Sequence, residues 1–366
     1  MKYLSRFIQL ELEVRGDYPI ALTDSQVVVS YNNKIIQYNR LGKKITSITL
    51  PISNFIGVLL SRSDLFRRFF RFGVIGSCCY GDEFICWTRK KYFIINMSNF
   101  EIIGQGAFPD NVYPLYMTYI SSEEYIPGFY FGGYLSNPQK KPVSVYRVDN
   151  FGCRSIFTFD KGEINHIHNI LYSEVMNKVF LLCGDFGDGA RIVEVSDSWK
   201  QHRALLKGQQ HARTCIGLFK DNCIVYPTDT SSEENGLVKL DLETGSVDII
   251  ASLPASSIYG DSNEKQLYFS TNLEASLESK SRFSKWVSTE LPKCFKTKFV
   301  HLYMYRGEKL LELVREKSDG LPLRLFQYPT FFLKSSCGDD MAIGYRALKG
   351  KKRVVSIYSI DTSCVT

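Results

Sequence analysis

Two histidines separated by a single residue are the part of this sequence best suited to chemistry. His166 and His168 lie in the segment Gly162–Asn169, which is predicted to form a β-strand. Residues two positions apart on a strand point to the same side of a sheet, so both imidazoles should face one surface. Such a pair could act as general base and acid, bind a divalent metal, or hydrogen-bond a sugar. The alternative is that one imidazole bridges neighbouring sheets and the other faces solvent.

An acidic turn follows the next predicted strand. Asp185 and Asp188 lie in the glycine-rich segment Gly184–Gly189, and glycine permits tight turns and the close approach of a ligand. Asp185 could orient a histidine, as carboxylates behind metal-binding imidazoles do; the alternative is a plain turn. We therefore predict that His166, His168 and Asp185 are catalytic residues.

Other polar residues near strand ends extend this candidate site. Arg191 and Arg213 are predicted to bind an acidic group of the substrate, because guanidinium groups bind carboxylates and sulfates through paired hydrogen bonds. Asp229 is predicted to be a fourth catalytic residue, as a general acid or as an acceptor for a sugar hydroxyl; a turn cap is the alternative. The remaining predicted substrate-binding residues are His211, Tyr134, Tyr259 and Glu274.

Short β-type segments recur along the chain and must position these residues. Gln26–Tyr31 and Lys34–Tyr38 read as a hairpin, and further turns join strands at Asn39–Lys43 and Asp241–Gly245. Strands spaced about 8–12 residues apart are typical of sandwiches, barrels and propellers. A four-stranded propeller blade takes about 40–50 residues, so the 366 residues fit roughly six to eight blades.

We predict a single all-β domain over residues 1–366, a β-propeller with seven blades favoured over six. Neither a linker nor a break in composition divides the chain. The C-terminal segment Val354–Ile360 is predicted to close the ring with the N-terminal segment Gln26–Tyr38, which would remove exposed sheet edges.

One segment departs from the β pattern. Apolar residues at helical spacing, with arginines between them, predict one inserted helix near residues 54–72. Its basic amphipathic surface could contact a membrane or an anionic glycan. The alternative is a helix packed on the propeller, with its arginines solvated or paired.

Composition limits the class of protein. A hydrophobic content of 44% indicates a globular chain, and a formal net charge of +7 is mild for this length, so nucleic acid is not an expected partner. The sequence has no run of about 18 apolar residues, so no transmembrane segment is predicted. With no export signal in the sequence, we expect a cytoplasmic protein whose ten cysteines are reduced. Walker, GxGxxG, HExxH and Gly-x-Ser-x-Gly motifs are absent from the sequence.

Nine short segments in the middle of the chain carry a family resemblance. They are Tyr130–Tyr134, Pro142–Tyr146, Asp149–Gly152, Gly162–His168, Cys183–Asp185, Val195–Trp199, Gly208–Arg213, Pro227–Thr230 and Ser270–Glu274. In these segments the sequence resembles bacterial sialidase-like β-propellers with Asp-box (BNR) repeats, whose members often occur near surface-polysaccharide functions.

The Asp-box itself is present only in degenerate form. The motif, Ser-x-Asp-x-Gly-x-Thr-Trp, is a turn between the two outer strands of a blade, in which the Asp folds back onto backbone N–H groups. Arg147–Gly152 keeps the Asp and the Gly, and Ser196–Trp199 keeps the Ser and the Trp. The resemblance implies a propeller fold. A sialidase also needs three arginines, a Tyr–Glu pair and an Asp acid, of which only Arg191 and Arg213 can be assigned here.

The leading functional prediction is that the chain binds or processes an anionic or acetamido sugar in bacterial surface-polysaccharide metabolism. A glycosidase- or lyase-type reaction would use His166 or His168 as base or acid, and a divalent metal could bind at the same pair. Whether the chain is an enzyme stays open, because no catalytic constellation is complete.

The alternative is a non-catalytic propeller scaffold that binds another protein. The missing sialidase constellation and the aromatic- and arginine-rich helix near Phe66–Phe72 support it. A deep polar pocket at the histidines would favour the first function, and a flat apolar patch would favour the second.

Overall fold

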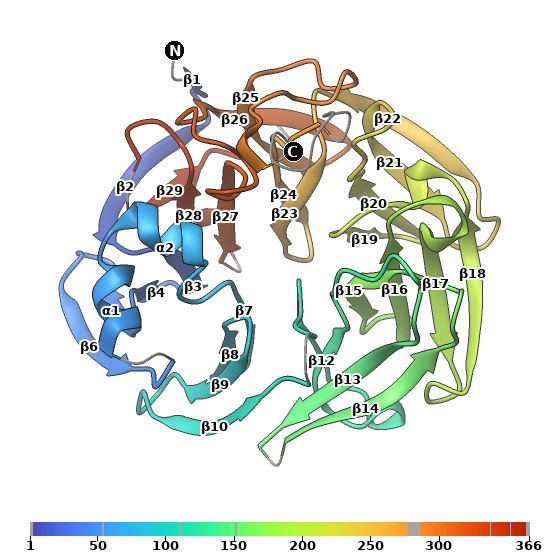
Figure 1. Ribbon diagram of the computed structural model, residues 1–366, viewed down its shortest axis with the longest axis horizontal. Helices are drawn as coiled ribbons and strands as arrows, with labels where there is room; N and C mark the ends of the chain where they lie inside the picture. The colour runs from blue at the N-terminus through green and yellow to red at the C-terminus, as the bar shows by residue number, and fades with distance from the viewer. Residues whose placement is uncertain are drawn as a thin grey trace. The chain divides into compact units, whose positions relative to one another are not determined.

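The structure is a computed structural model that describes residues 3–52, 55–109, 112–150, 152–276, 286–336, 338–351 and 353–363 (Figure 1). Over these residues the chain forms seven antiparallel sheets, six of four strands and one of five. Two short α-helices accompany these sheets. The protein is therefore an all-β, seven-bladed β-propeller, as the sequence predicted.

The chain divides into two compact units, which are described separately. The first consists of residues 1–74, 229–236 and 251–366, and the second of residues 75–228 and 237–250. The histidine pair and its neighbours belong to the second unit.

The second unit holds sheets in which consecutive strands pair in chain order, except that residues 235–236 and 251–253 of the last sheet belong to the first unit. They are β7 (Gly76–Tyr80), β8 (Glu83–Trp87), β9 (Lys91–Asn96) and β10 (Ile102–Ala107); β11 (Thr118–Ile120), β12 (Gly128–Gly132), β13 (Val143–Asp149) and β14 (Gly152–Phe159); β15 (His166–Ser173), β16 (Lys178–Gly184), β17 (Arg191–Ser196) and β18 (Gln201–Lys207); and β19 (Leu218–Lys220), β20 (Cys223–Pro227), β21 (Asn235–Asp241) and β22 (Val247–Leu253). Single-turn 3₁₀ helices occur at η1 (Glu123–Tyr125), η2 (Gly187–Gly189) and η3 (Gln210–Ala212).

The first unit holds three sheets and the two α-helices. The sheets are β3 (Tyr18–Leu22), β4 (Gln26–Tyr31), β5 (Lys34–Asn39) and β6 (Lys44–Thr49); β23 (Ser257–Ser262), β24 (Gln266–Thr271), β25 (Phe299–Arg306), β26 (Lys309–Lys317) and β1 (Tyr3–Leu4); and β27 (Thr330–Ser335), β28 (Asp340–Arg346), β29 (Val354–Ile360) and β2 (Ile8–Arg15). The helices are α1 (Phe55–Ser61) and α2 (Asp64–Phe70).

The turns singled out in the sequence join the third and fourth strands of their sheets. Asn39–Lys43 connects β5 to β6, and Asp241–Gly245 connects β21 to β22. The two degenerate Asp-boxes lie in the corresponding turns, β13–β14 and β17–β18. The Asp241 side chain stabilises its own turn, because its carboxylate accepts hydrogen bonds from the backbone N–H groups of Glu243 and Thr244 at 3.0 and 2.7 Å.

The C-terminal strand pairs with a different N-terminal segment from the one predicted. Strand β29 is antiparallel to β2, from Ile8 opposite Ile360 to Arg15 opposite Val354. The predicted partner, Gln26–Tyr38, instead forms β4 and β5 of a sheet that is completed by its own chain neighbours β3 and β6. The prediction of the pairing segment was therefore wrong: local hairpins already satisfy residues 18–49, and β2 remains to complete the C-terminal sheet.

The predicted single helix near residues 54–72 is two helices. The break lies at Arg62 and Ser63, where Ser63 adopts an extended backbone with φ −83° and ψ 127° before α2 begins at Asp64. An acidic residue in the first turn stabilises a helix N-terminus, so Asp64 favours a new start here. Asn54 lies outside the described residues. No helix among the described residues is long and apolar enough to span a membrane.

Candidate functional site

The pairing of β15 with β16 positions the two histidines. His166 lies opposite Gly184 and Ile167 opposite Cys183, and the register then shifts at a β-bulge before Asn169. His168 is the residue within this bulge. The apolar side chains of the hairpin fix its position, because Ile167, Ile170, Leu181 and Cys183 are all fully buried in one core cluster. The polar ends of the hairpin are thereby held at one edge of the core.

The structure brings three of the predicted catalytic residues together. The Nε2 atoms of His166 and His168 lie 2.9 Å apart. The Asp185 Oδ1 atom is 3.2 Å from the first of these nitrogens and 3.8 Å from the second. Both imidazoles are buried, while the Asp185 side chain keeps 27% of its surface exposed. The carboxylate is therefore the part of this cluster that solvent reaches.

Backbone carbonyls hold both imidazoles from behind. The Nδ1 atom of His166 lies 3.1 Å from the Leu135 carbonyl oxygen, and the Nδ1 atom of His168 lies 2.9 Å from that of Thr214. A carbonyl oxygen only accepts hydrogen bonds, so the hydrogen-bond pattern assigns a proton to Nδ1 in each ring. In a neutral imidazole the other nitrogen is then a lone-pair acceptor. Both Nε2 atoms thus offer lone pairs toward Asp185.

The electrostatics of the cluster favour an ionised Asp185. Burial by itself raises the pKa of Asp185, but the hydrogen bonds that a protonated imidazole would donate to it, together with the charge of Arg213, bring this pKa well below its usual range. Burial lowers the pKa of His166 below its ordinary value of 6.5, although hydrogen bonding with Asp185 acts in the opposite direction. The cluster therefore combines a carboxylate with imidazole nitrogens that are available as bases.

A second layer of side chains surrounds the carboxylate. The Nη2 atom of Arg213 lies 3.5 Å from Asp185 Oδ1, and its guanidinium stands 5.5 Å over the ring of Phe186. Gln210 in η3 donates a hydrogen bond of 3.3 Å to the Asp185 carbonyl oxygen. The ring of Tyr134 meets that of His166 edge to face, with centroids 4.6 Å apart. Two predicted substrate-binding residues, Arg213 and Tyr134, thus border the cluster.

The other candidates of this unit have different surroundings. Arg191 donates from Nε to the Asp188 carbonyl oxygen at 2.7 Å and from Nη2 to that of Glu163 at 3.0 Å. It therefore holds the turn that follows Asp185. Asp188 is exposed and pairs with Lys207 at 3.0 Å. His211 is half-buried in η3, two residues before Arg213.

Three predicted site residues belong to the first unit. Asp229 is buried, and the Glu274 carboxylate accepts a 3.3 Å hydrogen bond from the Ser256 hydroxyl. The Tyr259 ring packs against Phe332 and lies under the guanidinium of Arg346, 5.1 Å from its centroid. Their membership of the histidine site stays a prediction.

Residues that sequence reasoning did not place in the site act through their backbone. Leu135 and Thr214 supply only carbonyl oxygens, which leave no signature in side-chain type. The sequence did draw attention to Gly184, which directly precedes Asp185, as a glycine that could let a ligand approach. In the structure the space beside Gly184 is filled by the ring of His168.

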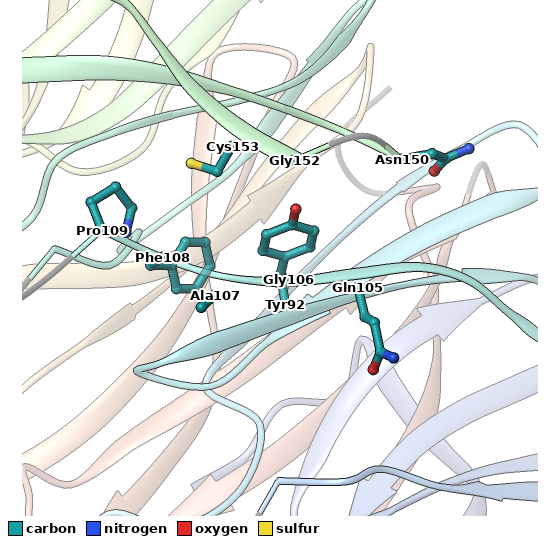
Figure 2. A pocket seen from close by; sticks show the side chains of 9 residues that line it. All are labelled: Tyr92, Gln105, Gly106, Ala107, Phe108, Pro109, Asn150, Gly152 and Cys153. Carbon is teal, nitrogen blue, oxygen red and sulfur yellow. The ribbon is translucent and has the colours of Figure 1, made fainter.

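A separate pocket of about 490 Å³ opens between β10 and the β13–β14 turn (Figure 2). It is lined by Tyr92, Gln105, Gly106, Ala107, Phe108, Pro109, Asn150, Gly152 and Cys153. Figure 2 shows the Tyr92 hydroxyl directed between these two segments. None of the predicted site residues lines this pocket.

Comparison with known proteins adds no functional assignment. No protein-family model and no curated protein sequence matches the chain. Solved structures do match, among them the C-terminal WD40 domain of Sif2, at 9% sequence identity over 96% of this chain and 82% of that domain, with a TM-score of 0.47. The fold class therefore rests on the sheet pairings of the chain itself.

Proposed function

We propose that this propeller binds a small acidic ligand, an acidic sugar being the best fit, at the cluster of His166, His168, Asp185 and Arg213. The observation that carries the proposal is the convergence of two imidazole nitrogens and a carboxylate within 3.8 Å, with a guanidinium beside them. Buried polar groups that converge in this way recur at binding and catalytic sites.

Each group has a role in recognising such a ligand. Arg213 can bind the ligand carboxylate, and the imidazole Nε2 atoms can accept hydrogen bonds from hydroxyls. The Phe186 side chain, which is 48% exposed, offers an apolar surface to a sugar ring. A glycosidase- or lyase-type reaction would use the same Nε2 atoms for proton transfer, because both Nδ1 atoms are engaged with carbonyls. The resemblance to sialidase-like propellers agrees with this ligand class.

Thermal unfolding in the presence of defined sugars tests this function. We expect galacturonate, glucuronate or N-acetylneuraminate to raise the unfolding midpoint, because a ligand that binds only the native state stabilises it. Glucose, which lacks the carboxylate, should leave the midpoint unchanged. The Arg213→Lys variant, which cannot form a paired guanidinium contact, should lose the shift. No shift with any acidic sugar, or an equal shift in Arg213→Lys, would overturn the proposal.

A second candidate function is protein binding through α1 and α2. Five large apolar side chains of these helices are exposed by 42–51%: Leu59, Leu65, Phe66, Phe69 and Phe70. Exposed apolar patches of this kind mark interaction surfaces. The rings pack on one another, with Phe69 4.9 Å from Phe70 and Phe66 6.4 Å from Phe70. We call these three phenylalanines and two leucines together the aromatic patch.

Charge indicates which partner would fit the aromatic patch. Arg67 and Arg68 are engaged internally, by Asp64 at 2.7 Å and by Asp319. Arg62 and Arg71 stand at the two ends of α2: Arg62 is exposed, and the Arg71 guanidinium donates a hydrogen bond to the Arg324 carbonyl oxygen at 3.3 Å. We propose an amphipathic helix with acidic flanks as the occupant.

A pair of synthetic helical peptides tests this second function. A Leu/Glu amphipathic helix should bind the wild type in fluorescence anisotropy, and a Leu/Lys helix of the same pattern should not. Phe66→Ser/Phe70→Ser should abolish binding while the fold is kept. Equal binding of both peptides, or undiminished binding by the variant, would rule the aromatic patch out.

A further inference from the structure

The cluster of His166, His168 and Asp185 has a geometry that demands a positive species at its centre. With both Nδ1 atoms donating to carbonyl oxygens, the Nε2 lone pairs face each other at 2.9 Å and face Asp185 Oδ1 at 3.2 and 3.8 Å. Lone pairs at this distance repel one another unless a proton or a cation lies between them. A shared proton could bridge only two of the three atoms, whereas a metal ion can bind all three.

We propose that His166 Nε2, His168 Nε2 and Asp185 Oδ1 bind one divalent transition-metal cation of the zinc class. Zinc bonds to imidazole and carboxylate are about 2.0–2.2 Å long, so ligand atoms in a tetrahedral site lie about 3.3 Å apart. The observed separations of 2.9, 3.2 and 3.8 Å bracket this value. Small shifts, within the reach of side-chain rotation, would equalise them.

The groups that hold the two imidazole rings are of the type found at metal sites. Metal-binding histidines usually donate their other ring nitrogen to a carbonyl or a carboxylate, which fixes the tautomer and the ring plane. Here the carbonyls of Leu135 and Thr214 do so. Two nitrogens and one oxygen favour zinc, cobalt, iron or manganese over calcium and magnesium, which prefer oxygen ligands alone.

The site would be incomplete with protein ligands alone. Three protein ligands leave a coordination position open, as in zinc sites that bind water or substrate. Since Asp185 is the exposed member of the cluster and Arg213 lies beside it, this position would be available to the carboxylate of an acidic ligand. In this respect the inference rests on the proposed function, whereas metal binding itself does not. A bound metal occupies both Nε2 lone pairs, so the acidic ligand would then be held by the metal and Arg213, and no longer by hydrogen bonds or proton transfer at the imidazoles.

Titration of the chelator-treated protein, residues 1–366, with metal alone tests the inference. Zn²⁺ should bind in a 1:1 ratio in calorimetry, and Co²⁺ should give the visible absorption of a low-symmetry site with nitrogen ligands. Mg²⁺ should not bind. Absence of Zn²⁺ and Co²⁺ binding to the wild type would overturn the proposal without recourse to any variant.

Variants localise the site. Asp185→Asn and His168→Gln should weaken Zn²⁺ binding at least about 100-fold, because each removes a ligand and loss of an outer partner alone costs about 10- to 100-fold. His202→Ala, which alters an exposed histidine of β18 outside the predicted site, should bind like the wild type. Wild-type affinity in Asp185→Asn would refute the assignment, and this variant changes the most exposed ligand, so folding is the least affected.

The metal site and the proposed function can fail independently. Zn²⁺ binding without any response to an acidic sugar would leave the metal site and refute the ligand. A response to the sugar that is unchanged after chelation, with no Zn²⁺ binding, would refute the metal site and leave the ligand.

Discussion

The imidazole of His168 occupies the space that a side chain at Gly184 would fill. A Cβ atom built on Gly184 would lie 2.3 Å from the Cε1 atom and 2.7 Å from the Nε2 atom of His168. Glycine is thus required because the ring of a histidine on β15 packs closely against the backbone of β16. The residue before Asp185 therefore controls the position of a metal-binding nitrogen.

We predict that Gly184→Ala displaces the His168 ring without changing any ligand side chain. Zn²⁺ affinity should fall at least about 10-fold, since Nε2 moves away from Asp185. Overpacking of a buried position should also lower the free energy of unfolding by about 1–3 kcal/mol. Calorimetry and urea unfolding measure the two effects.

A second glycine supplies the control for this substitution. At Gly338 an added Cβ would make only an ordinary contact of 3.7 Å, with the Ser336 hydroxyl. Gly338→Ala should therefore leave Zn²⁺ affinity unchanged. If Gly184→Ala also binds Zn²⁺ like the wild type, the proposed position of His168 is incorrect.

Arg213→Gln should change the affinities for metal and for acidic ligand in opposite directions. Its guanidinium lies 3.5 Å from Asp185, so removal of the positive charge should strengthen Zn²⁺ binding several-fold. Loss of a charge-assisted contact of about 1.5–3 kcal/mol should weaken an acidic sugar about 10- to 100-fold. Arg203→Gln, on an exposed arginine that pairs with Glu194, should alter neither affinity. A parallel change in both affinities would contradict the roles given to Arg213.

Asp17 is predicted to be a main electrostatic anchor of the first unit. Its buried carboxylate accepts two hydrogen bonds of 2.9 Å from Arg353 and one of 2.9 Å from the Asn32 backbone, and Arg67 Nε lies 3.6 Å away. Asp17→Asn removes the carboxylate that pairs with Arg353, whereas Arg67 keeps Asp64, and it should lower the free energy of unfolding by about 3 kcal/mol. Asp24→Asn, at an exposed carboxylate, should change it by less than about 0.5 kcal/mol. Urea unfolding measures the free energy of unfolding of both variants. Equally small decreases in the two would show that the contacts of Asp17 contribute little to stability.

The same carboxylate predicts a loss of stability in acid. Burial raises the pKa of Asp17, but Arg67, Arg353 and the Asn32 backbone N–H outweigh it and lower this pKa below 3.8. A carboxylate whose pKa is lowered by folding contributes stability that is fully present above the unfolded value and is lost as the pH falls through the folded value. The difference in unfolding free energy between wild type and Asp17→Asn should thus be constant at neutral pH and shrink below about pH 4. A constant difference down to pH 2 would contradict this.

Much of the fold could be predicted because its determinants are local. The hairpin Gln26–Tyr38 and the Asp241 turn follow from residues within a few positions of one another, and the chain length set against the size of a blade led to six to eight blades. The pairing of β29 with β2 could not be predicted in the same way, since Ile360 and Ile8 meet across nearly the whole chain. The break between α1 and α2 was missed because helical spacing of apolar residues continues through it.

The candidate site could be predicted only in part, for a similar reason. The rule that residues two apart share a face led to His166 and His168, and the hairpin led to Asp185. Chain order alone could not show that Arg191 is engaged by the carbonyls of Asp188 and Glu163. Neither could it reveal the carbonyls that fix the imidazole tautomers, because these are backbone groups of distant segments.

The most direct test of the account is calorimetric titration of galacturonate, glucuronate and N-acetylneuraminate into the protein in the presence of Zn²⁺. We predict saturable binding of at least one of these sugars at a 1:1 ratio, lost in Asp185→Asn and weakened in Arg213→Gln, with no heat from glucose. Binding of none of them, or binding that both variants retain in full, would contradict the claim that the cluster of His166, His168, Asp185 and Arg213 is the functional site.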